Sequence, residues 1–313
     1  MPERLDFKER KHLSVSEVKE FLSCPARWAF RYGMGLWTSG TNPYFALGNG
    51  VHAGLERWYW PNDPHNRDEA FRQMRRKVIS ESGQVDWSAA KEGDDPLTLR
   101  DKSERLLAVG VTVPGDDWIA AQVETTLYAD IKHSRLGKLP VPLKIRPDMV
   151  LESHDFIDHK TADKTWVAGK ERSEAQAVGY TIAGRQNFGH DPVTWFNIMI
   201  PTAIAKVDRR STMRDQDDID RFYGYARLLL DAEEKRVFYP NPTSWAHATC
   251  EFRRICDGWQ GTIGEFDLPT DRALQALVPN LSDRAARVSH EPPPEPPSIP
   301  APWDAADFIE VNG

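Results

Sequence analysis

DFIDHKTADKT, residues 155–165, is the stretch that decides the fold. Phe156 and Ile157 supply the apolar bulk of a buried strand, but three ionisable residues follow them directly: Asp158, His159 and Lys160. Side chains alternate between the two faces of a strand, so Asp158 and Lys160 share one face and the His159 side chain points to the other. The pattern predicts either a solvated strand end or a metal-dependent active site.

A second acidic residue precedes this strand. Within IRPDMVLESHDFIDHKTA (residues 145–162), ESHD suits a tight hairpin turn, and antiparallel pairing then brings Asp148 close to Asp158. Two carboxylates side by side repel each other unless a cation binds them, and oxygen ligands favour Mg²⁺ or Mn²⁺ over Zn²⁺. An ammonium at Lys160 can orient the attacking water and stabilise the negative charge of a phosphoryl transition state.

The composition of the whole chain limits the function classes. The 313 residues suffice for one large domain or two modest ones, and the net charge of −7 argues against broad, non-specific nucleic-acid binding but not against a local basic groove. The sequence has no Walker A motif and no GxGxxG motif, so we do not expect an ATP motor or a dinucleotide enzyme. We expect no signal peptide and no membrane span, and three widely spaced cysteines fit a reducing cytoplasm, either bacterial or that of a phage-infected host.

Hydrophobic periodicity predicts a mixed α/β domain with a helical N-terminal cap. The expected elements are helices over 14–33, 50–60 and 66–110 (the last in two pieces, split near 81–96), strands over 119–130, 141–151 and 154–161, a helix over 171–188, a strand over 193–200 and a helix over 216–238. We expect a single domain over 1–287, with the cap within about 13–115, a catalytic core over about 116–240 and a further segment over 241–260. The Pro-rich stretch 291–302 cannot form a packed element, and we expect 288–313 to be a disordered, Pro-rich acidic tail.

Four motifs in this order resemble those of the PD-(D/E)XK nuclease superfamily, and within it the RecB-like branch. Pro147-Asp148 followed by Asp158-His159-Lys160 matches the signature that names the superfamily. LSVSEVKEFLSCPARWAFRYG resembles the opening motif of the branch, ALGNGVHAGLE resembles its histidine motif at a helix start, and QAVGYTIAG resembles its Q-x-x-x-Y helix. The resemblance covers about residues 13–256. It implies a restriction-endonuclease-like core, a mixed central sheet flanked by helices.

The resemblance also implies roles for individual residues. The metal ligands would be His52, Asp148, Asp158 and the backbone carbonyl of His159, with Mg²⁺ or Mn²⁺ as the metal. Lys160 would be the catalytic lysine, and Gln176 and Tyr180 would hold the DNA strand or support Lys160. Basic residues around the motif would form a groove for the DNA backbone, although they are equally compatible with solubilising strand edges. The expected DNA-binding residues are Lys132, Arg135, Lys144, Arg146, Lys164 and Tyr180.

A second metal site is implied by the cysteines. Many RecB-like nucleases hold an iron–sulfur cluster with one early cysteine and a late group of three. Cys24 matches the early position, Cys250 and Cys256 match two of the late positions, and His247 occupies the remaining one. A [4Fe–4S] cluster, a Zn²⁺ ion and a metal-free packed core with free thiols all remain open.

The expected function is a divalent-metal-dependent DNA exonuclease, similar to stand-alone phage exonucleases and CRISPR-adaptation nucleases. It would hydrolyse DNA ends or single strands in recombination, repair or DNA processing, and the tail would contact a single-strand-binding or recombination partner. Two alternatives stay open: a catalytically silent DNA-binding or scaffold protein, and a nuclease subunit that depends on a separate helicase. The sequence does not decide the polarity of digestion.

Overall fold

The computed structural model describes residues 10–35, 42–112 and 118–256, except 84, 86, 88–89, 245–246, 248–249 and 254–255. The predicted tail, 288–313, and the predicted domain boundary at 287 lie outside the described residues. The helices are α1 (Val15–Ser23), α2 (Pro25–Trp28), the π-helix η1 (Ala29–Gly33), α3 (Pro43–Trp58), α4 (Arg67–Ser82), α5 (Pro96–Thr112), α6 (Lys170–Ser173), α7 (Gln176–Asn187) and α8 (Gln216–Glu234). The strands are β1 (Ala120–Val123), β2 (Leu127–Ala129), β3 (Lys132–His133), β4 (Gly137–Lys138), β5 (Leu143–Ile145), β6 (Met149–Leu151), β7 (Phe156–Thr161), β8 (Thr194–Ile200) and β9 (Lys206–Thr212).

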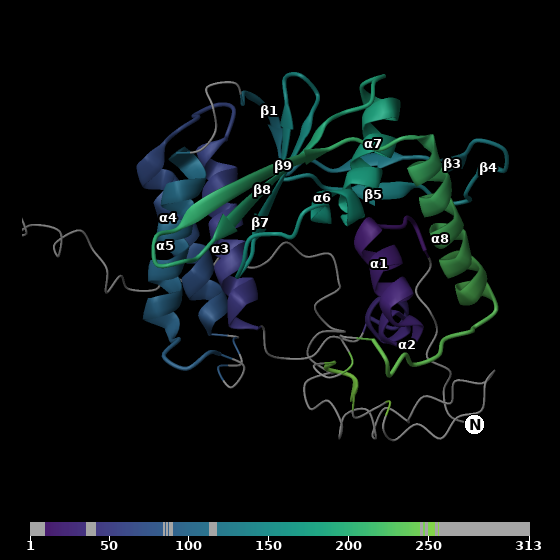
Figure 1. The fold of residues 1–313 in the computed structure, drawn as a ribbon, viewed down its shortest axis with the longest axis horizontal. Coiled ribbons are helices and arrows are strands. Elements are labelled where there is room, and N and C mark those ends of the chain that lie inside the picture. The colour runs from purple at the N-terminus through teal and green to yellow at the C-terminus, as the bar shows by residue number, and fades with distance from the viewer. Residues whose placement is uncertain are drawn as a thin grey trace, which may run out of the picture.

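A mixed sheet forms the centre of the described part of the chain. Its strand order is β1-β6-β7-β8-β9, in which β7 and β8 are parallel and the other neighbours are antiparallel. Figure 1 shows α3, α4 and α5 on one side of this sheet and α1, α7 and α8 on the other. The predicted fold class, a mixed sheet flanked by helices, is confirmed.

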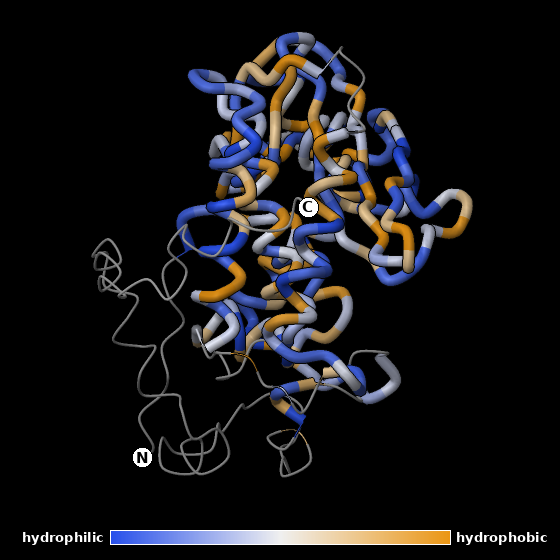
Figure 2. Tube along the Cα trace, turned by 90° about the vertical axis from the view of Figure 1, so that its left-hand side faces the viewer, coloured by the Kyte–Doolittle hydropathy of each residue, from blue (hydrophilic) through white to orange (hydrophobic). Residues whose placement is uncertain are grey.

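The sheet separates two hydrophobic cores. One core packs β7 and β6 residues against α1, α7 and α8, and the other packs them against α3, α4 and α5. Phe156 and Ile157 are adjacent on β7, are both fully buried, and belong to different cores. Each such side chain contributes about 1.5–3 kcal/mol. The helices interleave hydrophobic and hydrophilic residues, as expected when each helix buries one face (Figure 2).

The N-terminal helices begin where the sequence predicts. The Ser14 side chain accepts a hydrogen bond from the Glu17 backbone N–H, and the Glu17 side chain accepts one from the Ser14 N–H, which is a complete capping box. Pro25 begins the next helix, as expected. Leu13 joins this cap to the sheet region, because its N–H donates to the Pro142 carbonyl at 2.9 Å.

Helix α3 is longer than predicted. The expected helix starts at residue 50 after a small-residue turn, whereas α3 starts at Pro43, capped by the Asn42 side chain. The glycines lie inside the helix because neighbouring helices approach it closely. A Cβ on Gly54 would lie 2.6 Å from Leu107 Cδ2, and one on Gly50 would overlap Val78.

Two long predicted strands are each broken in two. The expected strand over 119–130 is divided into β1 and β2, and the one over 141–151 into β5 and β6. Glu124 lies in the first break with a φ of 52°, and Asp148 lies in the second. The Glu124 N–H donates to the Asp148 carbonyl at 3.0 Å, so the two breaks are side by side.

Three further details differ from the prediction. The expected helix over 171–188 is interrupted between α6 and α7, and α8 ends at Glu234 rather than at 238. Strand β9 is absent from the predicted elements because its sequence, KVDRRST, is polar; it pairs with β8 along its full length at the sheet edge. In the described ranges, no helix is long and apolar enough to cross a membrane.

Candidate active site

The predicted β6–β7 hairpin is confirmed and brings two carboxylates together. Met149 pairs with Ile157, so Asp148 lies opposite Asp158, one position further along. The His159 backbone N–H donates to Asp148 Oδ2 at 2.5 Å, which fixes that carboxylate against β7. Both acidic residues are largely buried, with side-chain exposures of 16% for Asp148 and 3% for Asp158.

Three residues form a group with metal-ligand spacing. One ligand atom each of His52, Glu124 and Asp148 lies within 4.8 Å of the others, and His52 Nδ1 is 3.3 Å from Asp148 Oδ1. Helix α3 supplies the histidine, and the two strand breaks supply the acidic residues. One imidazole nitrogen and two carboxylates are suitable donors for a divalent cation. All three side chains are partly exposed, so the group is accessible to solvent.

The electrostatics of this group also fit a cation. Burial opposes the ionisation of Asp148, but the charge of His52 and its hydrogen bond to the carboxylate, together with the charge of Lys160, outweigh burial and lower the pKa of Asp148. Burial lowers the pKa of His52, but the Asp148 carboxylate outweighs this and raises it. Burial, followed by the negative charge of Asp148, raises the pKa of Glu124 to about 7. The raised pKa of Glu124 reflects two carboxylates held close together in a partly buried place, and a bound cation would relieve this repulsion.

Asp158 is held by two neighbours. Its Oδ1 accepts a hydrogen bond from the Tyr180 hydroxyl at 2.6 Å, and its Oδ2 lies 2.6 Å from Lys160 Nζ. Burial and the charge of Asp148 raise the pKa of Asp158, against the effect of Lys160. Burial alone would lower the pKa of Lys160, but Asp158 and Asp148 raise it, so the ammonium stays charged. The metal-ligand role of Asp158 remains a prediction.

Tyr180 lies behind this carboxylate. Its ring stacks on Phe156 with centroids 5.2 Å apart, and the residue is only 3% exposed. That position favours the predicted supporting role over the predicted DNA contact. Gln176 begins α7 one turn before Tyr180 and is partly exposed. Its role remains a prediction.

The His159 side chain lies on the opposite face of β7, as predicted. It is buried, its Nδ1 is 3.2 Å from Asn197 Nδ2, and its ring stacks on Tyr59 with centroids 6.0 Å apart. Burial lowers the pKa of His159 to about 4, so the ring is neutral at pH 7. Coordination of a metal by its backbone carbonyl remains a prediction.

The predicted DNA-binding residues do not form one group. Arg146 reaches the metal group, with its Nε 2.6 Å from Glu124 Oε2. Lys144 is on β5, and Lys164 is exposed beyond the end of β7. Lys132 and Arg135 belong to the β3–β4 hairpin, which Figure 1 places at the far end of the molecule beyond α8. Of these residues, Arg146 is therefore positioned at the candidate site.

The segment with the late cysteines packs against the N-terminal helices. Arg27 lies 3.3 Å from Glu251, and the Phe30 and Phe252 rings are 5.3 Å apart. Cys24 Sγ accepts a hydrogen bond from the Asn241 N–H at 3.4 Å. In the part of the chain that the structure describes, no three of the four proposed cluster ligands come within 4.8 Å of one another. The cluster remains a prediction, as does a Zn²⁺ ion at Cys24, His247, Cys250 and Cys256.

Sequence reasoning missed Glu124. Glu124 lies in the middle of the strand predicted over 119–130, and the alternation of side chains along a strand does not distinguish one acidic residue there from any other. The available signal was its place in QVETTLYAD, between two short β-forming segments, but the break itself depends on the contact with Asp148.

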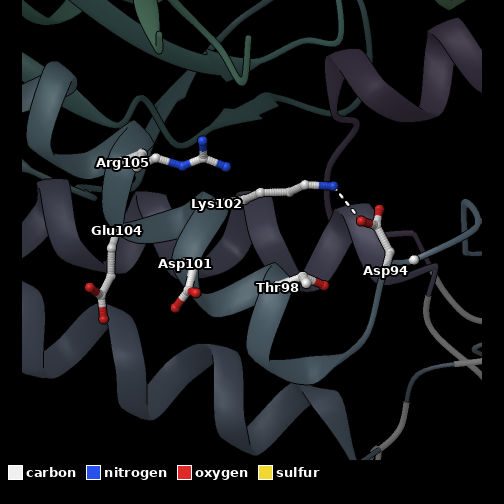
Figure 3. A pocket seen from close by; sticks show the side chains of 7 residues that line it. Asp94, Thr98, Asp101, Lys102, Glu104 and Arg105 are labelled. Carbon is white, nitrogen blue, oxygen red and sulfur yellow. Dashed lines mark hydrogen bonds and ion pairs between the residues drawn. The ribbon is translucent and has the colours of Figure 1, made fainter. Parts of the chain in front are cut away.

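A separate hollow along α5 has different chemistry. It has a volume of about 590 Å³ and is lined by Asp94, Asp101, Lys102, Glu104 and Arg105, together with Gly93 and Thr98. Figure 3 shows that Lys102 forms an ion pair with Asp94, while Asp101 and Glu104 point away from Arg105. The hollow contains none of the predicted site residues, and its lining carries three acidic and two basic side chains.

Comparisons with known proteins bear on the fold and on the family of the chain. The chain is similar in structure to a protein of Eubacterium rectale that is provisionally named an exonuclease, with 12% identity, a TM-score of 0.50, and coverage of 86% of this chain and 94% of that one. A second solved structure, SSO0001, has 12% identity and a TM-score of 0.33, with 78% of this chain and 93% of that one covered. This similarity is too weak to indicate a shared fold. No curated protein sequence matches the chain.

The assignment to a family rests on the sequence. The similarity to the Eubacterium rectale structure shows the fold alone, because the sequence identity is only 12%. The sequence model of the PD-(D/E)XK nuclease superfamily matches residues 12–257, which is more than half of the chain and includes every residue of the site described above. The chain therefore belongs to the PD-(D/E)XK nuclease superfamily.

Proposed function

We propose that this chain is a DNA exonuclease of the RecB-like branch that uses Mg²⁺ or Mn²⁺ to hydrolyse DNA ends or single strands. Members of the superfamily are metal-dependent nucleases. The observation that carries the proposal is the adjacency of a metal-binding group to a charged lysine: Asp148 lies between His52 and Glu124 on one side and the Asp158–Lys160 pair on the other. The similarity to the Eubacterium rectale protein supports exonuclease activity.

The cation would be held by His52, Glu124 and Asp148, and its chemistry there is to neutralise phosphate charge and to lower the pKa of water. Each of these residues offers one nitrogen or oxygen ligand atom, and the three atoms lie within 4.8 Å of one another. The His159 N–H holds Asp148 in place, and Arg146 adds a positive charge beside Glu124. The site therefore combines a cation-binding face with a donor that favours approach of the DNA backbone.

The Lys160 ammonium acts as a fixed positive charge. Its raised pKa keeps it protonated at neutral pH, so it is not the base that activates water. Asp158 holds Nζ in place, and the Tyr180 hydroxyl holds Asp158. Water attacks the phosphorus and gives up a proton to the solvent, while the P–O bond to the leaving sugar oxygen breaks and that oxygen takes up a proton from the solvent. During this step the charge of Lys160 stabilises the phosphoryl oxygens.

End-labelled linear DNA and closed circular DNA test the proposal. The protein should shorten linear single- or double-stranded DNA with Mg²⁺ or Mn²⁺, leave circles intact, and stop in EDTA. Lys160→Ala should reduce the rate by at least about a hundredfold, since one preorganised donor is worth about that much. Separate 5′ and 3′ labels report the polarity.

Three results would contradict the proposal. Equal cleavage by the wild type and Lys160→Ala would show that the chemistry is elsewhere. Cleavage of circles would replace exonuclease activity with endonuclease activity. Binding of DNA without cleavage under any metal would favour the silent scaffold protein, unless an added helicase restored cleavage.

A further inference from the structure

A hollow with aromatic walls lies between the end of α3 and the start of β1. It has a volume of about 410 Å³, within the range of small-molecule sites. Its aromatic lining consists of Trp58, Tyr59, His65 and Trp118. The Trp58 and His65 rings are 4.9 Å apart and tilted by 32°, and Tyr59 meets His65 edge-on at 6.3 Å. These walls suit a flat, unsaturated ligand.

A positive charge lies beside the hollow. The Arg209 guanidinium is 4.0 Å from the centre of the Trp118 ring, which lines the hollow. Trp58 Nε1 and Tyr59 Oη are buried, so the surface that is open to a ligand consists of the aromatic rings rather than of these polar atoms.

The hollow and the metal group are linked by two rigid elements. Helix α3 carries His52 in the metal group and Tyr59 in the hollow, about 10 Å apart along its axis. Strand β1 begins in the hollow at Ala120, and Glu124 follows its last residue, about 13 Å away along the strand. Tyr59 also stacks on His159, which is adjacent to Asp158 in the chain. The hollow thus has a fixed position relative to the reaction centre, at the scale of a nucleotide or two.

We propose that this hollow binds an unpaired nucleobase of the DNA strand whose phosphate lies at the metal group. The inference rests on the proposed function, because it takes DNA as the substrate. A base has faces that stack on aromatic rings, and its phosphate is an anion that the positive charge of nearby Arg209 attracts. An inorganic anion would leave the aromatic rings without a stacking partner, and so would a saturated aliphatic chain.

The role predicted for the site is positioning. A base held at a set distance from the scissile phosphate fixes the register of the strand without reading its sequence, because every base presents a stacking face. Single-stranded DNA, or the frayed end of a duplex, is then the form that fills both sites at once.

An abasic scan tests this directly. Short fluorescent single strands, each lacking the base at one position, are titrated with the protein in Ca²⁺, with intact length checked on a gel. The strand that lacks the base at one particular position should bind about tenfold more weakly than the intact strand, because one stacked base contributes about this much to binding. Strands that lack a base at another position should bind like the intact strand. Trp118→Ala should bind the intact strand about tenfold more weakly and lose all sensitivity to that position.

A second variant that removes a ring of the hollow and a matched control variant complete the test. His65→Asn retains the residue type that tolerates the φ of 63° at this position while removing the ring, so it should reproduce the Trp118→Ala result even if that variant folds poorly. Trp60→Ala is the matched control, because Trp60 is an exposed tryptophan just beyond α3 that does not line the hollow. It should leave the scan unchanged.

The outcomes separate this inference from the proposed function. A flat scan in a protein that cleaves the intact strand overturns the nucleobase site and leaves the nuclease assignment standing. A position-specific effect that persists unchanged in both Trp118→Ala and His65→Asn places the base elsewhere and also overturns it. Displacement of the strand by the peptide WDAADFIEV (residues 303–311) combined with a flat scan would assign the hollow to a peptide. A protein that neither binds nor cleaves the intact strand contradicts both proposals.

Discussion

At the scale of single residues, Glu124 is the residue whose contribution the sequence does not reveal. Its carboxylate completes a group with His52 and Asp148, and the same carboxylate forms an ion pair with Arg146. Removing the charge of Glu124 leaves only one carboxylate and one imidazole for the cation. The ion pair with Arg146 is also lost, but Arg146 is 60% exposed and such a pair contributes little to stability, so the effect should appear in metal affinity rather than in folding.

We predict that Glu124→Gln weakens Mn²⁺ binding by at least about tenfold, the lower end of the effect of losing even an outer-shell partner. Isothermal titration with Mn²⁺ measures this, and circular dichroism checks the fold. Glu152→Gln, an exposed glutamate in the β6–β7 turn, is the control and should bind like the wild type. Unchanged affinity in Glu124→Gln would remove Glu124 from the ligand set.

A second residue-scale prediction concerns Tyr180. Its hydroxyl is the buried donor to Asp158, and Asp158 in turn holds Lys160. Tyr180→Phe keeps the ring packing on Phe156 and removes only this hydrogen bond, so the cleavage rate should fall by about 10- to 100-fold.

The measurement compares the single-turnover cleavage rates of Tyr180→Phe and the wild type over a range of pH values. Tyr225→Phe, which changes a partly exposed tyrosine on α8, should cleave at the wild-type rate. A wild-type rate in Tyr180→Phe would show that Asp158 needs no support from α7.

At the scale of elements, the close packing of α3 accounts for its glycines. We predict that Gly54→Ala lowers the free energy of unfolding by about 1–3 kcal/mol, because the new methyl group would meet Leu107 at 2.6 Å in a core without space for it. Urea denaturation measures the change. Gly83→Ala is the control: it has open space around it and a φ of −67°, so it should be neutral or stabilising by up to about 1 kcal/mol. Equal effects at both positions would show that α3 is not tightly packed.

The contact between α1 and α6 gives a prediction with a pH dependence. Buried Glu174 pairs with Lys19 at 2.7 Å and Lys170 at 3.1 Å, and these lysines outweigh burial and lower its pKa. A depressed folded pKa stabilises the protein above the unfolded value of 4.5, and this stabilisation is lost as pH falls through the folded pKa.

Glu174→Gln should therefore lower the free energy of unfolding by about 1–2 kcal/mol at pH 7 and by progressively less below pH 4.5. Urea denaturation at a series of pH values measures the difference from the wild type. Glu234→Gln, an exposed residue at the end of α8, should show no such trend. A difference that grows on acidification would contradict the assigned direction of the pKa shift.

These elements also show what the sequence can and cannot predict. The capping box at Ser14 and the β6–β7 hairpin are local patterns, and both were predicted correctly. The start of α3 was wrong because glycine has two uses, in turns and in close helix contacts, and only the neighbouring Val78 and Leu107 distinguish them. The breaks at Glu124 and Asp148 depend on a contact between distant segments, so no local pattern encodes them.

At the scale of the whole molecule, the candidate site lies where the two hydrophobic cores meet. His52 comes from the helices on one side of the sheet, while Tyr180 comes from α7 on the other. Between them, Asp148 lies directly before β6, and Asp158 lies on the neighbouring strand β7. The adjacent residues Phe156 and Ile157 anchor β7 in both cores, which explains why one short strand fixes both the fold and the site.

This arrangement predicts that a divalent cation stabilises the entire fold. Its three ligands are far apart in the sequence and come together only in the folded chain, so the cation binds the native state in preference to the unfolded state. At a Mn²⁺ concentration about 100 times the dissociation constant, the free energy of unfolding should rise by about 2.7 kcal/mol. Urea denaturation with Mn²⁺ and with EDTA measures the gain. In His52→Gln the gain should be much smaller at the same Mn²⁺ concentration, whereas an equal gain in both proteins would place the stabilising cation at another site.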